Sequence, residues 1–330
     1  MTNGTRASVA AMAALLVSCT GGGGGGDPAP VPVDEAEYKI LAFNDLGMHC
    51  LNPTYDDVVI LPPYNTVVAQ VVRRGNPPQV VTAGLTVEYR LVGNTWSYGK
   101  GTYGQFWDQA EALFGAASLP HDFGLNLADP TISNGLSGTM AVVGDHFSAD
   151  GIPAVPMGDD LVWNPYQVAE LTLKDAGGNV LARTTATVPT SDELDCAKCH
   201  GANPFADIRA EHLERQPSAT LPTPVLCASC HGSPALGIMS HSGGATTWLS
   251  QAVHGFHGRL SPDERPACYD CHPGQRTQCS RSLAHTAADG NCVHCHGALP
   301  EVAASIAAGR VPWVSEPVCV DCHAGVPEVD

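Results

Sequence analysis

The chain has 330 residues, of which 44% are hydrophobic and only 15% are charged, and its formal net charge at pH 7 is −17. This composition belongs to a folded chain and excludes both a disordered polyampholyte and an integral membrane protein. The acidic balance also argues against nucleic-acid binding, which needs a basic surface.

The first segment along the chain is an apolar run at residues 9–17. It is too short to span a membrane and is typical of a signal-peptide core. The sequence Leu16-Val17-Ser18-Cys19 closes this run and resembles a bacterial lipobox, whose cysteine receives a lipid. We therefore expect residues 1–19 to be a lipoprotein signal peptide, with Cys19 as the lipid attachment site, and residues 20–37 to be a Gly/Pro-rich tether. A plain cleaved signal peptide is the alternative, and both interpretations export the protein.

Residues 38–190 have the pattern of a β domain. Short runs rich in strand-forming residues occur at 38–43, 66–72, 85–92, 139–143, 168–174 and 180–188. The turn residues 175–179 between the last two runs predict a β-hairpin, and one short helix is predicted at 106–117. Short strands separated by Gly- and Pro-rich turns indicate an all-β, sandwich-like domain.

One segment of this region gathers possible metal ligands. Asp45, Met48, His49 and Cys50 lie close together, and copper or another soft metal uses such groups. We favour a strand-to-turn segment with a buried cysteine, because no second cysteine is near. Cys50 and Cys279 lie outside every repeated motif, and a disulfide between them is an alternative that the sequence cannot decide.

Ten of the thirteen cysteines fall in five copies of the pattern Cys-x-x-Cys-His within residues 191–330. Two cysteines at this spacing can bind the two vinyl groups of one haem, and the following histidine then ligates the iron. Zinc ribbons have no need of a histidine after each pair, and a thioredoxin-like redox site uses a single pair. The pattern therefore predicts five covalent haem c groups. Their attachment cysteines and proximal histidines are Cys196, Cys199 and His200; Cys227, Cys230 and His231; Cys268, Cys271 and His272; Cys292, Cys295 and His296; and Cys319, Cys322 and His323.

The same part of the chain contains five histidines outside the motifs, which are His212, His241, His254, His257 and His285. Five proximal and five further histidines predict that every iron has two axial imidazoles, which would close it to substrate and favour a low potential. His294, inside the fourth motif, is a sixth candidate ligand, and Met239 is a weaker one.

Residues 191–330 are too few to enclose five haems and also build an ordinary hydrophobic core. We expect the porphyrins themselves to form that core, within an irregular, mostly α/coil domain that has little regular secondary structure beyond short helices such as 208–215. The predicted function is electron relay between neighbouring haems, with the cofactor supplying the chemistry.

This region resembles the multihaem c-type cytochromes of metal- and sulfur-respiring bacteria. The resemblance rests on the third motif with Pro273-Gly274, on the fourth with Gly297, and on Pro312-Trp313 before the fifth; residues 41–50 and 61–64 resemble a domain of such exported cytochromes. It implies an outer-membrane lipoprotein, periplasmic or at the cell surface, that contacts the membrane only through its lipid. It also implies electron exchange with other cytochromes, soluble metal ions or metal oxides. Assembly into oligomers or filaments stays open.

The alternative function is a multihaem reductase of nitrite or another small oxyanion, with one open haem. Such enzymes typically carry a lysine in place of one motif histidine, whereas all five motifs here end in histidine. The sequence therefore favours an electron carrier over an enzyme.

Overall fold

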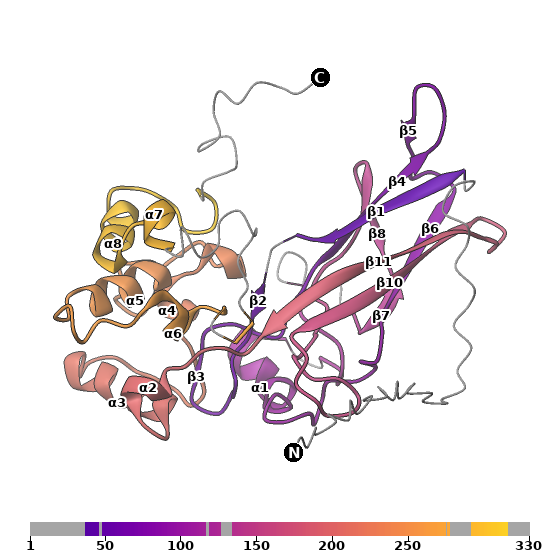
Figure 1. The fold of residues 1–330 in the computed structure, drawn as a ribbon. Coiled ribbons are helices and arrows are strands. Elements are labelled where there is room, and N and C mark those ends of the chain that lie inside the picture. The colour runs from indigo at the N-terminus through magenta and orange to yellow at the C-terminus, as the bar shows by residue number, and fades with distance from the viewer. Residues whose placement is uncertain are drawn as a thin grey trace, which may run out of the picture. The chain divides into compact units, whose positions relative to one another are not determined.

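The strand-forming runs of the N-terminal half fold into two five-stranded sheets (Figure 1). The structure is a computed structural model, and it describes residues 37–45, 48–116, 119–126, 134–274, 276–277 and 292–315, without the side chains of His294 and Cys295. The predicted lipobox, residues 20–36 of the predicted tether and the fifth motif lie outside these residues.

The first sheet is antiparallel and has the order β1-β4-β9-β8, with β5 paired to β4. Its strands are β1 (Tyr38–Asn44), β4 (Val67–Arg73), β5 (Gln79–Val80), β8 (Ala141–Val143) and β9 (His146–Ala149). Burial alternates along β4, where Val67, Ala69 and Val71 are fully buried and Val68 and Gln70 are half-buried. This period of two gives the sheet one apolar face.

The second sheet has the order β2-β11-β10-β6-β7 and is antiparallel except for β2, which runs parallel to β11. Its strands are β2 (His49–Cys50), β6 (Leu85–Leu91), β7 (Ser137–Thr139), β10 (Tyr166–Asp175) and β11 (Val180–Ser191). The predicted hairpin of β10 and β11 is confirmed. Its turn is held by the Asp175 carboxylate, which accepts hydrogen bonds from the backbone N–H groups of Gly177 and Asn179 at 2.8 and 2.9 Å.

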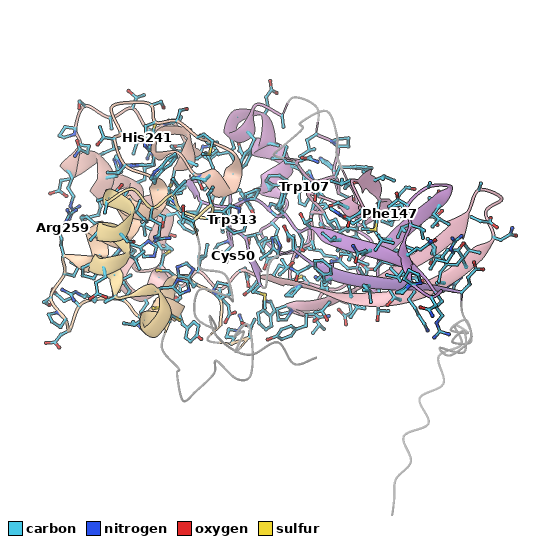
Figure 2. All side chains as sticks on the ribbon, turned by 90° about the horizontal axis from the view of Figure 1, so that it is seen from above. Cys50, Trp107, Phe147, His241, Arg259 and Trp313 are labelled. Carbon is cyan, nitrogen blue, oxygen red and sulfur yellow. The ribbon has the colours of Figure 1, made fainter. Side chains whose placement is uncertain are left out.

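One apolar core is shared by the two sheets. Val71 and Phe147 enter it from the first sheet, and Val87 and Leu171 enter it from the second. Each of the four is at most 1% exposed, and Phe147 is seen among the strands in Figure 2. The prediction of a β domain at the N-terminus is thus confirmed.

The predicted strand at 139–143 is two strands. Residues before Met140 form β7 on β6, and residues after it form β8 on β9. Met140 itself is buried in the shared core, so the chain crosses there from one sheet to the other. The predicted helix at 106–117 is α1 (Gln105–Phe114), which ends at Gly115 in the left-handed conformation (φ 67°) that glycine adopts most easily.

Beyond Ser191 the described chain is made of short helices and one two-residue strand. These are α2 (Ala197–His200), α3 (Pro204–Arg215), β12 (Val225–Leu226), α4 (Ala228–His231), the 3₁₀ turn η1 (Pro234–Leu236), α5 (Leu249–Gly258), α6 (Cys268–Cys271), α7 (Cys292–His296) and α8 (Leu299–Ala307). The expected helix at 208–215 is the C-terminal part of α3. Within the ranges described above, no helix has the length and apolarity required to cross a membrane.

The helical region has little apolar core of its own. Its buried apolar residues among those described, prolines and glycines aside, are Phe205, Val225, Leu226, Ala228, Leu236 and Ile306. The first five belong to clusters that also contain N-terminal residues such as Val58, Tyr55 and Phe106. The described residues beyond 240 therefore contribute two buried apolar side chains, Ile306 and Pro312.

Candidate haem-attachment sites

The Cys-x-x-Cys-His motifs described by the structure form single helical turns, α2, α4, α6 and α7. In the first motif the backbone N–H of His200 donates to the carbonyl of Cys196 at 2.9 Å, and His231 and His272 make the equivalent bonds to Cys227 and Cys268 at 3.1 and 2.8 Å. Residues i, i+3 and i+4 of a helical turn lie on one side. Both cysteines and the histidine of a motif can thus address one ligand.

The N-terminal region anchors the chain just ahead of the first two motifs. β2 pairs in parallel with the end of β11, five residues before Cys196, and β3 (Val58–Val59) pairs in parallel with β12, directly before Cys227. The N–H of Cys227 donates to the carbonyl of Val59 at 3.0 Å. Both motifs are therefore tied by backbone hydrogen bonds to segments far away in sequence.

Three motif histidines each face one of the histidines outside the motifs. The ring centroids are 6.5 Å apart for His200 and His257, 6.2 Å for His212 and His231, and 6.0 Å for His254 and His272. Three of the histidines predicted as distal ligands thus lie near a motif histidine. The planes of the first two pairs are nearly perpendicular, at 86° and 76°, and those of the third are nearly parallel, at 21°.

Most of these histidines make a hydrogen bond through Nδ1. In the first facing pair, Nδ1 of His200 bonds the Asp207 carboxylate at 2.8 Å and Nδ1 of His257 donates to the Val253 carbonyl at 2.9 Å. Nδ1 of His254 donates to the Ser250 carbonyl at 2.7 Å. A nitrogen that donates to an oxygen carries the proton, so the lone pair is on Nε2. Metal-ligating histidines are held in this way.

His212 and His231 complete the second pair. Nδ1 of His231 donates to the Thr247 carbonyl at 3.1 Å, whereas Nδ1 of His212 is buried without a hydrogen-bond partner among the described residues. Partial burial lowers the pKa of His231 below the usual value. Its ring is therefore neutral at pH 7, which is the form that binds a metal.

These residues fit a haem better than a bare ion. Metal–imidazole bonds are about 2 Å long, so two imidazoles on opposite sides of one iron have ring centroids about 6 Å apart. Within the described part of the chain, no group of three or more His, Cys, Asp or Glu residues is arranged to hold a metal ion. Two axial histidines suffice for haem, because the porphyrin supplies the other four nitrogens.

The motif cysteines whose side chains the structure describes do not have the features of a redox-active pair. None of Cys196, Cys199, Cys227, Cys230, Cys268, Cys271 and Cys292 forms a disulfide. Burial raises the pKa of the Cys227 thiol to about 12 and that of Cys271 to about 11. A redox-active Cys-x-x-Cys pair has a lowered pKa instead, so these sites differ from a thioredoxin-like centre.

The remaining predicted ligands divide into two groups. His241 does not face a motif histidine in the described region: its Nδ1 donates to the His231 carbonyl at 2.6 Å and its ring packs against Trp248. Met239 is 59% exposed. His285, Cys279, Cys319, Cys322 and His323 lie outside the described residues, as do the side chains of His294 and Cys295.

The segment around Cys50 has the features of a turn followed by a strand. Nε2 of His49 lies 3.0 Å from the Asp45 carboxylate, and Cys50 is half-buried in β2. The other histidines of this half have separate surroundings, since His121 stacks on Tyr98 and His146 lies beside Asp145.

Sequence reasoning missed the groups that orient the imidazoles. Asp207 lies near the start of α3, the helix after the first motif. In the sequence, only this position could have indicated that it orients a histidine. The carbonyls of Val253 and Ser250 follow from the i to i−4 geometry of α5, but only once both histidines are known to be on a helix.

Comparison with known proteins identifies no family. No protein-family model matches the chain, and no curated protein is detectably related. Among solved structures, the chain is similar to HBP35 of Porphyromonas gingivalis at 6% identity with a TM-score of 0.21, covering 46% of this chain and 40% of that one. The matched part is less than half of that protein.

Proposed function

We propose that the protein is a multihaem c-type cytochrome that relays electrons and that residues 191–330 form a haem c domain with porphyrins in place of an apolar core. The observation that carries the proposal is the approach of three motif histidines to three further histidines at about 6 Å between ring centroids. The scarcity of buried apolar side chains beyond residue 240 supports it.

The chain's own residues have three tasks in this function. The cysteines of each motif bind one haem covalently, and the histidine on the same turn ligates its iron. Asp207 and the backbone carbonyls of Val253, Ser250 and Thr247 orient the imidazoles through Nδ1, so that Nε2 is presented for ligation. When bound, haem iron supplies reversible one-electron chemistry between Fe(III) and Fe(II).

Ligation on both faces favours a carrier over a catalyst. A second imidazole occupies the position that a substrate would take. His257, His212 and His254 stand opposite three of the motif histidines, and this argues against an open iron at those sites. The oxyanion-reductase alternative requires at least one site without such a residue.

The setting of the function follows from the N-terminal sequence. The lipobox at Cys19 supports an exported outer-membrane lipoprotein, periplasmic or on the cell surface. The partners we propose are other redox proteins, soluble metal ions or metal oxides. The net charge of −17 favours partners that present cationic surfaces.

The test is a spin-state census of the protein produced in a host with cytochrome maturation. We expect the mass of five covalent haems and an electron paramagnetic resonance (EPR) spectrum of the oxidised protein that contains only low-spin iron. One stoichiometric high-spin signal would favour the reductase. Protein without covalent haem would refute both functions.

A further inference from the structure

The four described motifs do not follow one another in space as they do in sequence. We propose that their haem sites stand in the order second, first, third, fourth, and that α5 supplies the distal ligand to both central sites, His257 to the first and His254 to the third. This inference rests on the proposed function, and it adds the spatial order of the haem sites and the distal ligands of two of them.

The first and third motifs are in direct contact. The Lys198 ammonium, between the two cysteines of the first motif, lies 2.6 Å from the carboxylate of Asp270, between those of the third. The backbone N–H of Asp195 also donates to the carbonyl of Asp270 at 2.9 Å. Asp270 is nearly buried, with a side-chain exposure of 6%. The two motifs thus meet in a structured contact rather than at a mobile surface.

Helix α5 faces both of these motifs. His254 and His257 are one turn apart, and their rings stand opposite His272 and His200, respectively. Both donate Nδ1–H to carbonyls of the preceding turn, so both rings are oriented by the same helix. Ligands one turn apart on a rigid helix fix the spacing of the two sites that they serve.

The second motif adjoins the first. Cys196 and Cys227 pack against one apolar cluster that contains Val58, Phe205 and Val225. His212 is on α3, the helix that follows the first motif, yet its ring faces His231 of the second. The helix that follows the first motif therefore supplies a histidine to the site of the second motif.

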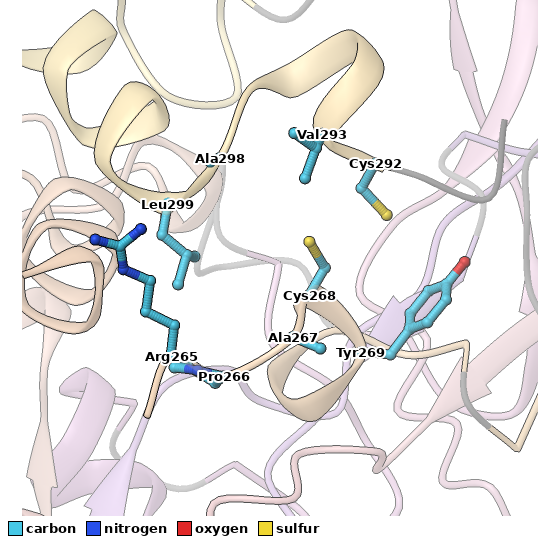
Figure 3. A pocket seen from close by; sticks show the side chains of 9 residues that line it. All are labelled: Arg265, Pro266, Ala267, Cys268, Tyr269, Cys292, Val293, Ala298 and Leu299. Carbon is cyan, nitrogen blue, oxygen red and sulfur yellow. The ribbon is translucent and has the colours of Figure 1, made fainter. Parts of the chain in front are cut away.

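The third motif adjoins the fourth on its other side. The side chains of Cys268 and Cys292 lie near each other (Figure 3). Both side chains line one pocket of about 270 Å³, together with the apolar residues Val293 and Leu299 (Figure 3). α8, which follows the fourth motif, packs on α5 through Gly255 and Gly258. The third motif is thus placed between the first and the fourth.

The ligand assignment is tested by combining two kinds of variant in the full chain. His257→Ala alone should convert one haem to high spin. Cys196→Ser with Cys199→Ser should remove one haem by mass, and adding His257→Ala to that protein should produce no high-spin signal. Adding His254→Ala to the same protein should produce one. A high-spin signal from His257→Ala after the first haem is removed would overturn the assignment.

The reciprocal background is the matched control. Cys268→Ser with Cys271→Ser should remove the third haem. In that protein, we expect His254→Ala to produce no high-spin signal and His257→Ala to give one high-spin haem. If every histidine variant keeps all haems low-spin, the ligand assignment fails; if no haem is attached, the proposed function itself fails. High-spin signals that appear in the wrong background refute only the arrangement.

The order is tested without deleting a haem, in case the deletions prevent folding. The double variant His254→Ala with His257→Ala should place two high-spin irons at adjacent sites, and His212→Ala with His254→Ala should place them at sites separated by a third. Dipolar broadening and faster spin relaxation should be stronger in the first protein. Equal broadening in the two proteins would overturn the order.

Discussion

The ammonium of Lys198 pairs with the carboxylate of Asp270 at 2.6 Å, although 72 residues separate them in the chain. Asp270 also accepts a hydrogen bond from the backbone N–H of Ala267 at 2.7 Å. One nearly buried carboxylate therefore caps the turn of the third motif and holds the first motif beside it.

The first prediction concerns this ion pair. Lys198→Met should lower the free energy of unfolding by more than the loss of an ion pair between two exposed side chains does, because a nearly buried carboxylate loses its cationic partner. Urea denaturation of the haem-loaded protein measures this. Lys174→Met is the matched control, since the bond of Lys174 to Glu88 is also 2.6 Å long but the Glu88 carboxylate is 44% exposed, against 6% for Asp270. We expect a loss below about 1 kcal/mol there, and equal losses would contradict the prediction.

The second prediction concerns Glu193, which joins the end of β11 to the loop after the third motif. Its carboxylate accepts hydrogen bonds from Thr277 Oγ1 at 2.8 Å, from the N–H of Arg276 at 2.5 Å and from Ser191 Oγ at 2.9 Å. Partial burial by itself raises the pKa of Glu193, but these hydrogen bonds outweigh it and lower the pKa below the usual value.

A lowered pKa in the folded state means that Glu193 stabilises the protein above its unfolded pKa of about 4.3 and loses this effect as the pH falls through the folded value. Glu193→Gln should therefore cost about 1 kcal/mol at pH 7, a figure reduced for solvent screening. The cost should shrink toward zero below about pH 4. Urea titrations of both proteins at several pH values measure the difference, and a cost that is constant with pH would contradict the assignment.

The third prediction compares two glycines of α5. A Cβ atom on Gly258 would lie 2.9 Å from the backbone nitrogen of Pro300, whereas a Cβ on Gly255 would meet the Ala303 side chain at an ordinary 3.4 Å. We expect Gly258→Ala to destabilise the protein by about 1–3 kcal/mol through overpacking. Gly255→Ala should be neutral or stabilise it by up to about 1 kcal/mol, because alanine favours the helix.

Thermal unfolding of the two alanine variants provides the measurement. The spin state of the haems provides a second one, because a displaced α5 would move both His254 and His257. Gly258→Ala should raise the high-spin content, and Gly255→Ala should leave it unchanged. The opposite order of the two variants would contradict the packing of α5 on α8.

The fourth prediction concerns loss of the haems. In a host without cytochrome maturation, trypsin should cleave after Arg259, at the end of α5 (Figure 2), far faster than in the haem-loaded protein. The reason is that the described chain beyond residue 240 buries only Ile306 and Pro312 as apolar residues. Arg90 is the control, since it lies on β6 in the sheet and pairs with Glu170 at 3.0 Å.

Cleavage sites are identified by mass spectrometry. Arg90 should be protected in both proteins, because the two-sheet core contains no motif residue. Equal protection at Arg259 with and without haem would show that the helical region folds by itself, and would contradict a porphyrin core.

Much of the fold was accessible from sequence where the pattern was long enough. β4 and the β10–β11 hairpin alternate over seven or more residues, so the period of two is readable. The strands β2, β3 and β12 have two residues each. No periodicity can be detected over so short a length, and these strands exist because a distant segment lies alongside them.

The sequence by itself determined the predicted chemistry of the motifs, because the cysteines and the histidine that must address one ligand lie within a single helical turn. Only the tertiary structure decided which of the other histidines face them. His212 follows the first motif but faces His231 of the second, and His257 faces His200 across 57 residues. Such pairs depend on how separate helices pack against each other, and the spacing of residues along the chain does not predict that packing.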